Sequence, residues 1–393
     1  MTTAVMRIPL AVPPWGDEEI NEAIDSLKSG MLTMGSKVKR FEQAWADYIG
    51  VKHAVMTNSG SSANLLALSA LGLPAGSEVI TPALTWATTV FPIAQVGLVP
   101  VLVDVDPLTY NIDPLAVEAA ITPKTRAIMP VHLLGNPCDM DAIVSIVQRY
   151  NLLMVEDCCE AHGAQHRGSH VGVDGNLATF SFFFSHHVST IEGGMVLTNY
   201  DAMADNLRGM RAFGWVRDRS DKAGIIRAHP EIDPRFLFST PGYNVRPTEI
   251  GGAFGIHQVP KLEGYIAIRR ENAAYWNKAL SVYSQWLQLP EERPGTRHVS
   301  FAYAVTVKEG APFTKQEFQD YLESRGVETR QIEAGCMSLQ PAMASLNYRA
   351  GPLPNAEYIH HNGFFWGNNH AIGAPERAAV VGYVEEFMKA RGL

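Results

Sequence analysis

The chain has 393 residues, of which 46% are hydrophobic and 18% charged, and its formal net charge is −8. The length predicts two domains, and the composition is that of an ordinary globular protein. The negative charge disfavours nucleic acids and acidic membranes as partners, and no apolar run approaches the roughly 18 residues of a membrane helix. Residues 1–9 lack the charged-then-apolar pattern of a signal peptide.

The four cysteines, at positions 138, 158, 159 and 336, predict reduced thiols and a cytoplasmic location. Cys158 and Cys159 are neighbours and are therefore a poor disulfide pair. No Cys-x-x-Cys spacing is present for a zinc or iron–sulfur site. We therefore expect no metal centre.

The N-terminal part reads as helix, strand and helix. Residues 15–50 predict two amphipathic helices separated by a loop at 30–35, followed by a strand at 53–58 and a helix at 63–71. The turn between that strand and helix is Ser-Gly-Ser-Ser, residues 59–62. Such a turn directs backbone N–H groups and a helix dipole towards an anion, although by itself it is more often only a helix cap.

From residue 78 onward, strands and helices alternate. We expect strands at 78–81, 99–105, 127–134 and 152–155, with helices at 86–95, 114–120 and 139–150. This rhythm is typical of a mostly parallel sheet between helices, in which ligands bind beyond the carboxyl ends of the strands. Trp86, Asp157 and the turn at 59–62 would all lie at that edge.

Residues 180–199 enclose a polar turn between two apolar runs. The turn contains His186, His187, a carboxylate and a Gly-Gly pair, and the flanking runs predict buried strands. A turn held in this way would be a rigid platform for chemistry. A surface hairpin with incidental histidines fits this stretch equally well.

The C-terminal part predicts a second, smaller domain. A long helix at 261–287 would connect the domains, which we divide into 1–260 and 261–393. Strands are expected at 300–307 and 328–332, and helices at 315–324 and 375–390. The polar stretch 217–234, before the connecting helix, predicts an active-site loop or an interface arm, with disorder as the alternative.

Four blocks carry a resemblance to a known family: 58–68, 81–89, 156–164 and 180–194, supported by 242–249. In this order and spacing the chain resembles the DegT/DnrJ/EryC1/StrS sugar aminotransferases, which are fold-type-I pyridoxal phosphate (PLP) enzymes. The resemblance implies an α/β large domain with a mostly parallel seven-stranded sheet between helices, and a smaller α+β C-terminal domain. It also implies a homodimer with shared active sites.

The resemblance assigns cofactor contacts. The phosphate would be held by the turn at Ser61 and Ser62, by the Ser181 hydroxyl, and by Asn244 from the other subunit. Asp157 would keep the pyridine nitrogen protonated, which the electron sink requires. Trp86 would stack on the ring, with core packing as its alternative, and Glu160 stands near the ring hydroxyl, where the family usually has Gln.

One position departs from the family aminotransferases. Their Schiff-base lysine lies six residues after the Phe matched by Phe180, and here that position is His186. No lysine occurs between Lys124 and Lys222, so a small misalignment cannot restore one. A histidine cannot hold PLP covalently, but it can move a proton. The pattern at 186–194 resembles the nucleotide-sugar 3-dehydratase branch, which makes this replacement.

That branch implies a lyase that removes the C3 hydroxyl of a nucleotide-linked 4-keto-6-deoxy sugar, with GDP favoured, in deoxysugar and lipopolysaccharide O-antigen biosynthesis. His186 would be the base, and the cofactor would alternate between PLP and pyridoxamine phosphate (PMP). One form of the branch uses an iron–sulfur cluster, for which the cysteines are wrongly spaced. The other uses L-glutamate as amino donor. Substrate contacts are assigned to Arg246, Arg330 and His187.

Three other interpretations remain open. An aminotransferase with a noncovalent cofactor would form an amino sugar from the same substrate. A non-catalytic PLP- or sugar-binding regulator would be expected to lose Asp157 together with the lysine. A metal site is the third, and its candidate ligands would be His162, His166, His170, His186 and His187. For His187 a purely structural hydrogen bond is the alternative to a substrate contact, and for Arg330 it is a surface salt bridge.

Overall fold

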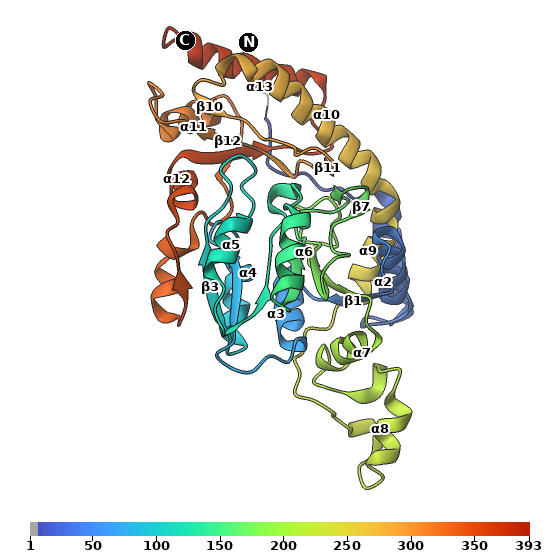
Figure 1. Cartoon of the computed structure of the whole chain (residues 1–393). Coiled ribbons are helices and arrows are strands. Elements are labelled where there is room, and N and C mark those ends of the chain that lie inside the picture. The colour runs from blue at the N-terminus through green and yellow to red at the C-terminus, as the bar shows by residue number, and fades with distance from the viewer. Residues whose placement is uncertain (1–6) are drawn as a thin grey trace.

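The structure, a computed structural model, describes residues 7–393. The expectation about a signal peptide falls mostly on residues 1–6, outside the described residues. The large domain is built on one sheet between layers of helices (Figure 1). Its strands lie in the order β1 (His53–Thr57), β9 (Gly194–Thr198), β8 (Leu177–Ser181), β5 (Leu153–Asp157), β4 (Thr125–Ile128), β2 (Glu78–Pro82), β3 (Val99–Val103) and β14 (Arg349–Ala350).

The strand β9 runs antiparallel to β1 and β8, and the remaining neighbours pair in parallel. The expected seven strands are therefore present, and β14 adds a short eighth one from the C-terminal part of the chain. Because the parallel strands share one direction, their carboxyl ends gather at one edge. That edge carries the site described below.

Helices cover both faces of this sheet. The side-chain oxygens of Ser59, Asp139 and Thr248 cap three of them and fix where these helices begin. The helices of the large domain are α1 (Asp17–Ser29), α2 (Ser36–Ile49), α3 (Gly60–Ala70), α4 (Ala87–Gln95), α5 (Pro114–Ala120), α6 (Met140–Arg149), α7 (Asp201–Met210), α8 (Lys222–Ala228) and α9 (Glu249–Gln258).

The stretch 180–199 is fixed by aromatic packing. Trp45 of α2 is fully buried, and its ring meets those of Phe180 and Phe182 edge-on, with centroids 5.2 and 5.1 Å apart. Every residue of β8 and β9 is buried. The expectation of two buried strands is confirmed, and the surface-hairpin alternative is excluded.

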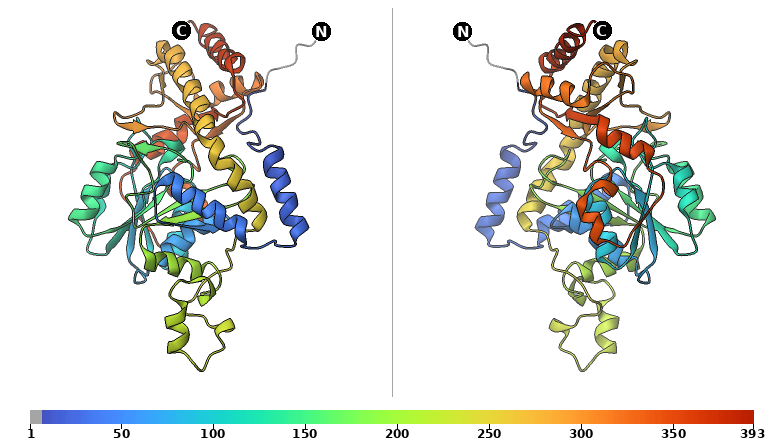
Figure 2. Two further views of the ribbon diagram at one scale, coloured as in Figure 1. Left: turned by 90° about the vertical axis from the view of Figure 1, so that its right-hand side faces the viewer. Right: turned by 90° about the vertical axis from the view of Figure 1, so that its left-hand side faces the viewer.

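The small domain stands at one end of the molecule, and the gold helix α10 (Leu262–Leu280) runs into it from the large domain (Figures 1 and 2). Its antiparallel sheet has the order β10 (Leu287–Gln288), β12 (Ala302–Val307), β15 (Gly363–Gly367) and β13 (Thr329–Gln331). The helices here are α11 (Lys315–Ser324), α12 (Pro354–Asn362) and α13 (Ala374–Lys389). Ile8, near the start of the chain, also packs into this domain's core. The division at residue 260 stays a prediction.

Several details differ from the sequence-based expectations. The strand expected at 127–134 ends at Ile128, because Pro130 has no N–H for the ladder and Leu134 adopts a left-handed backbone with φ 53°. The helix α12 and the strand β15 were not expected. The stretch 217–234 contains α8 and extends away from the body at the end opposite the small domain (Figure 2).

A minor sheet joins β11 (Thr296–Arg297) to the hairpin of β6 (Gln165–His166) and β7 (Ser169–His170). Within residues 7–393, no helix combines the length and the apolar character that crossing a bilayer requires.

Candidate active site

A cavity of about 400 Å³ lies at the carboxyl edge of the large sheet. The segments that follow β1, β2, β5 and β8 each contribute to it, as expected for a parallel sheet. The small domain closes it with residues from β12, β13 and the adjoining loops. The predicted site residues that line the cavity are Ser61, Trp86, Asp157, Glu160, Ser181, His186 and Arg330.

The turn after β1 forms one wall. The Ser59 hydroxyl accepts a hydrogen bond from the Ser62 amide at 3.1 Å and caps α3, so Ser62 is held by the cap and does not line the cavity. A Cβ on Gly60 would lie 2.4 Å from the Cβ of Ser181, so only glycine permits this approach of turn and strand. The N-terminus of α3 and the side chains of Ser61 and Ser181 together suit an anion.

Asp157 stands at the end of β5 with 3% of its surface exposed. One carboxylate oxygen accepts hydrogen bonds from Asn64 at 3.0 Å and Thr89 at 2.9 Å, and the other accepts one from the Cys159 amide at 3.2 Å. Three donors fix the position and orientation of the carboxylate. Asn64 and Thr89 were not among the predicted site residues, although both lie within the matched blocks 58–68 and 81–89.

Two further groups project from neighbouring loops. Trp86 precedes α4 and exposes 55% of its surface, so it lines the cavity and is not core packing. The Glu160 carboxylate accepts a hydrogen bond from the Leu134 amide at 2.7 Å. Burial raises the pKa of Glu160 well above its ordinary value, and contact with Glu333 raises it further.

His186 lines the cavity in the turn between β8 and β9. Its ring lies 5.3 Å from that of Phe301, and its Nδ1 atom has no hydrogen-bond partner among residues 7–393. Burial, reinforced by the nearby Arg269 guanidinium, lowers the pKa of His186 to about 3. The imidazole is therefore uncharged at neutral pH and can accept a proton.

Two other imidazoles lie behind His186. The rings of His186 and His187 are 5.9 and 5.7 Å from that of His162, and burial lowers the pKa of His162 and His187 well below the ordinary value. His187 is 1% exposed, donates to the Val299 carbonyl at 3.3 Å and does not line the cavity. Its position matches the structural alternative rather than the assigned substrate contact.

A profile of the DegT/DnrJ/EryC1/StrS aminotransferase family matches residues 14–385. The chain belongs to this family. It is 39% identical to a GDP-4-keto-6-deoxy-D-mannose 3-dehydratase of Yersinia pseudotuberculosis over 96% of this chain and 98% of that protein.

Two solved structures extend the comparison. A histidine-to-asparagine variant of a GDP-4-keto-6-deoxymannose-3-dehydratase with bound GDP-perosamine gives a TM-score of 0.91 at 35% identity, covering 96% of this chain and all of that one. The same kind of enzyme with a trapped PLP-glutamate geminal diamine gives a TM-score of 0.88 at 34% identity, again covering 96% of this chain and all of that one.

The turn that the family resemblance assigned to the other subunit lies outside the cavity. Asn244 is exposed, and its side-chain oxygen accepts a hydrogen bond from Arg246 at 3.0 Å. The Arg246 guanidinium lies over the Phe213 ring at 5.0 Å. Neither residue lines the cavity of its own chain, whereas Arg330 of β13 does.

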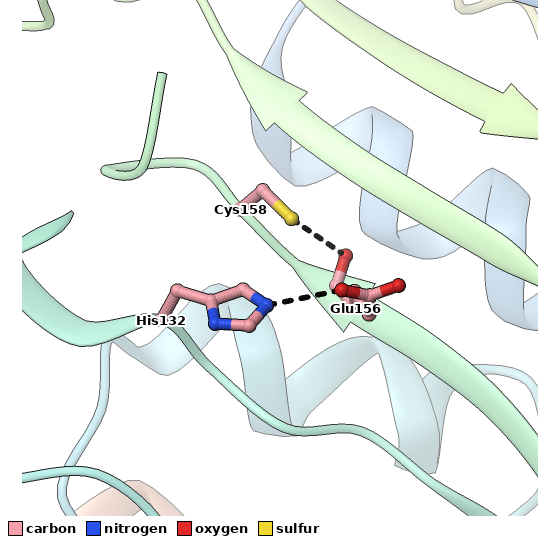
Figure 3. A group of neighbouring side chains, drawn as sticks. All are labelled: His132, Glu156 and Cys158. Atoms are coloured by element: carbon pink, nitrogen blue, oxygen red, sulfur yellow. Dashed lines mark hydrogen bonds and ion pairs between the residues drawn. The ribbon is translucent and has the colours of Figure 1, made fainter. Parts of the chain in front are cut away.

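A buried group of potential metal ligands lies behind the carboxyl end of β5 (Figure 3). His132 faces Glu156 at 3.1 Å, with Cys158 beside them. The other His132 nitrogen already accepts from the Cys138 amide at 3.1 Å. The Glu156 carboxylate already accepts from three backbone amides of the loop 172–175, at 2.6 to 3.0 Å. Because these atoms are already hydrogen-bonded within the protein, we interpret the group as a structural clamp that holds the loop 172–175 against β5, and not as a metal site.

The alternative metal site built from five histidines is a different set. His166, on the β6–β7 hairpin, faces Asp141 of α6 at 3.6 Å, and His170 packs on the Tyr48 ring. Within residues 7–393, these histidines do not converge on a common point.

Replacing Glu156 with alanine is expected to destabilise the protein by about 3–5 kcal/mol, since three backbone amides of the loop 172–175, one of them fully buried, and the buried His132 lose their acceptor. Chemical unfolding of the cofactor-free protein measures the change. Glu385→Ala on the exposed face of α13 is the matched control, and its effect should stay within about 0.5 kcal/mol. A loss below about 1 kcal/mol for Glu156→Ala would show that the clamp is not needed for stability.

Proposed function

We propose that this protein is a PLP- and PMP-dependent lyase that removes the C3 hydroxyl of a GDP-linked 4-keto-6-deoxyhexose, using L-glutamate as amino donor. This activity belongs to deoxysugar biosynthesis for lipopolysaccharide O-antigen, and we infer a cytoplasmic location. The observation that carries the proposal is an uncharged imidazole, His186, at the position where the family's aminotransferases have their lysine. The similarity to the 3-dehydratases supports it.

The cavity fits the cofactor. The α3 N-terminus with Ser61 and Ser181 suits a phosphate, Trp86 offers a flat exposed face, and Asp157 is a fixed carboxylate inside the same cavity. When bound, PLP supplies an electron sink that stabilises negative charge next to its C4′ carbon. Asp157 keeps the pyridine nitrogen protonated, because a buried carboxylate raises the pKa of a base beside it.

His186 then acts as the proton acceptor at C4′. Its side chain is uncharged at neutral pH, so it can take a proton without first losing one. A histidine cannot form a covalent bond to the aldehyde as a lysine does, so the cofactor is held by noncovalent contacts alone. The aromatic wall of Phe301 and Phe183 limits access of water to this position.

The overall reaction balances without a metal or a reductase. The sugar loses one oxygen atom and keeps its carbonyl, which is a two-electron reduction, and L-glutamate is oxidised to 2-oxoglutarate with release of ammonia. A glutamate carboxylate needs a cation in the cavity. Arg330 is our candidate, because it projects from β13 into the cavity. The solved relative with a PLP-glutamate geminal diamine supports glutamate as the donor.

We expect turnover to depend strictly on L-glutamate. With no other amine source, deoxygenated sugar should not exceed the PMP initially bound, and with glutamate one 2-oxoglutarate should form for each product molecule. The assay uses purified enzyme in air with no reductase, and mass spectrometry of the sugar. Sustained turnover in the absence of any amino donor would contradict this mechanism.

The same assay separates the alternatives. A product one oxygen atom lighter that retains its carbonyl identifies the dehydratase, whereas a product with an amino group identifies an aminotransferase. A regulator would give neither product and would still bind the cofactor. The retention of Asp157 in a built carboxylate site argues against the regulator.

We also propose an obligate homodimer with shared sites. Asn244 and Arg246 lie outside their own cavity, and the neighbouring aromatic residues Phe213, Phe236 and Phe238 expose 39%, 62% and 50% of their surface. Such exposed aromatic area favours an interface. Sedimentation at assay concentration should therefore show a dimer. Asn244→Ala should weaken cofactor retention without dissociating the dimer. A fully active monomer would refute the shared site.

A further inference from the structure

Two glutamates from different domains meet in the cavity. Glu160 follows β5 in the large domain, and Glu333 follows β13 in the small domain. Both line the same cavity, and their carboxyl groups are in contact with each other. In the described part of the chain, neither glutamate forms a salt bridge with a lysine, arginine or histidine. The proposed cofactor contacts account for Glu160 but give no role to Glu333.

The backbone positions both carboxyl groups. Glu333 adopts a left-handed conformation with φ 49°, which is strained for a non-glycine residue. Its neighbour Ile332 is buried in the core between the domains, and a Cβ on Gly335 would lie 2.0 Å from the Gln331 side chain. This tight turn therefore holds Glu333 in place. On the other side, the Leu134 amide fixes one oxygen of Glu160.

Contact between two carboxyl groups requires a shared proton, because two adjacent carboxylates would repel each other. The other titratable or charged groups that line the same cavity are Asp157, Cys159, His186, Glu192 and Arg330, and the imidazole of His186 is uncharged. Burial raises the pKa of Glu160 and of Glu333, and the charge of Asp157 raises both further. Burial and mutual contact thus both favour retention of a proton by the pair.

We propose that the Glu160–Glu333 pair is the general acid of the reaction and gives its shared proton to the hydroxyl oxygen that leaves C3. This inference rests on the proposed function. The C3–O bond breaks, its electron pair stays with the oxygen, and the oxygen departs as water with the proton of the pair. With the cofactor bound, the electrons that replace this bond would come from the cofactor C4′–H bond, and His186 would accept its proton. Both groups then exchange protons with solvent, so no other reagent is needed.

The pairing also gives a reason for the reaction outcome. His186 and the acid pair are separate groups, so proton removal and leaving-group protonation do not compete for one side chain. A protonated leaving group departs as water rather than as hydroxide, which favours elimination over return of the proton to the sugar.

The shared proton can be tested without turnover. Infrared spectra of the cofactor-free, full-length protein at neutral pH should show the C=O stretch of a protonated carboxyl group, and Glu333→Gln should remove it. Glu309→Gln, which changes an exposed turn residue, should leave it unchanged. Absence of the band in the wild type, or its survival in both Glu333→Gln and Glu160→Gln, would overturn the proposal.

The acid role is tested by changing the leaving group. Glu333→Gln should slow deoxygenation of the normal sugar on the order of 10²-fold. Conversion of PLP to PMP by L-glutamate, followed by absorbance, should remain near wild type. An analogue with fluorine at C3 loses fluoride, which needs less protonation, so its rate should fall far less in the variant. Equal losses for the hydroxyl and fluoro sugars would overturn the proposal and indicate a structural role.

The two proposals can fail separately. If the wild type forms no deoxygenated sugar, the proposed function is wrong, whereas the infrared band still reports on the shared proton. If deoxygenation proceeds in the wild type and survives in Glu333→Gln at about the same rate, only the acid assignment is wrong. Circular dichroism of each variant confirms that the comparison is made on folded protein.

Discussion

Replacing His186 with asparagine is expected to reduce deoxygenation by roughly 10²–10⁴-fold while preserving binding of cofactor and nucleotide sugar. Asparagine is close in size to histidine, but its amide cannot accept a proton at neutral pH. The cavity walls formed by Phe301 and Asp157 should stay in place, because in the described part of the chain no side-chain hydrogen bond joins His186 to them. Product formation by mass spectrometry and cofactor binding by absorbance measure the two effects.

The matched control is His166→Asn, the same change on the β6–β7 hairpin, which should leave turnover unchanged. His186→Lys should form a covalent pyridoxyl adduct that borohydride makes permanent, whereas the wild type should release its cofactor on dialysis. Near-normal turnover in His186→Asn would show that another residue is the catalytic base. A borohydride-stable adduct in the wild type would contradict the noncovalent site.

Replacing Asp157 with asparagine is expected to lower turnover on the order of 10²–10³-fold, because the pyridine nitrogen loses the negative charge that keeps it protonated. Asn64 and Thr89 donate to one oxygen of Asp157, and an amide NH₂ group in that place would face these donors. The buried mismatch should also cost about 1–3 kcal/mol of stability. Steady-state turnover and chemical unfolding measure the two losses.

Asp113→Asn is the control for this change. Asp113 caps α5, far from the cavity, and asparagine preserves this cap. The substitution should therefore alter neither turnover nor stability appreciably. If Asp157→Asn destabilises the protein but keeps full turnover, the carboxylate is only structural. A loss of turnover with unchanged affinity for the sugar is the expected pattern.

The local sequence predicted most of the elements and the residues at the strand ends. Asp157 and Ser181 end buried strands, and Trp86 and His186 follow such strands. Parallel strands bring residues at their carboxyl ends to one edge, whichever helices connect the strands. Errors were concentrated where tertiary context decides. The strand after residue 127 stops early at Pro130, and β15 lies in an apolar stretch with no period of its own.

Contacts between distant segments had no local signal. Asn64 and Thr89 were inside matched blocks, but their role depends on reaching Asp157 from two different helices. Asn244 and Arg246 were assigned through the family resemblance to a neighbouring subunit, and their proposed contact stays a prediction.

The sequence alone determined most strands and helices of the large domain, the position of the Ser-Gly-Ser-Ser turn after β1, and the replacement of lysine by His186, because each depends on residues close together in the chain. Only the tertiary structure decided that His186 is uncharged, that His187 is turned away from the cavity, and that Glu160 meets Glu333. These properties depend on burial and on side chains contributed by the other domain. Desolvation and pairing act through space, so the pKa values and the contact between the two carboxyl groups follow from how the domains pack.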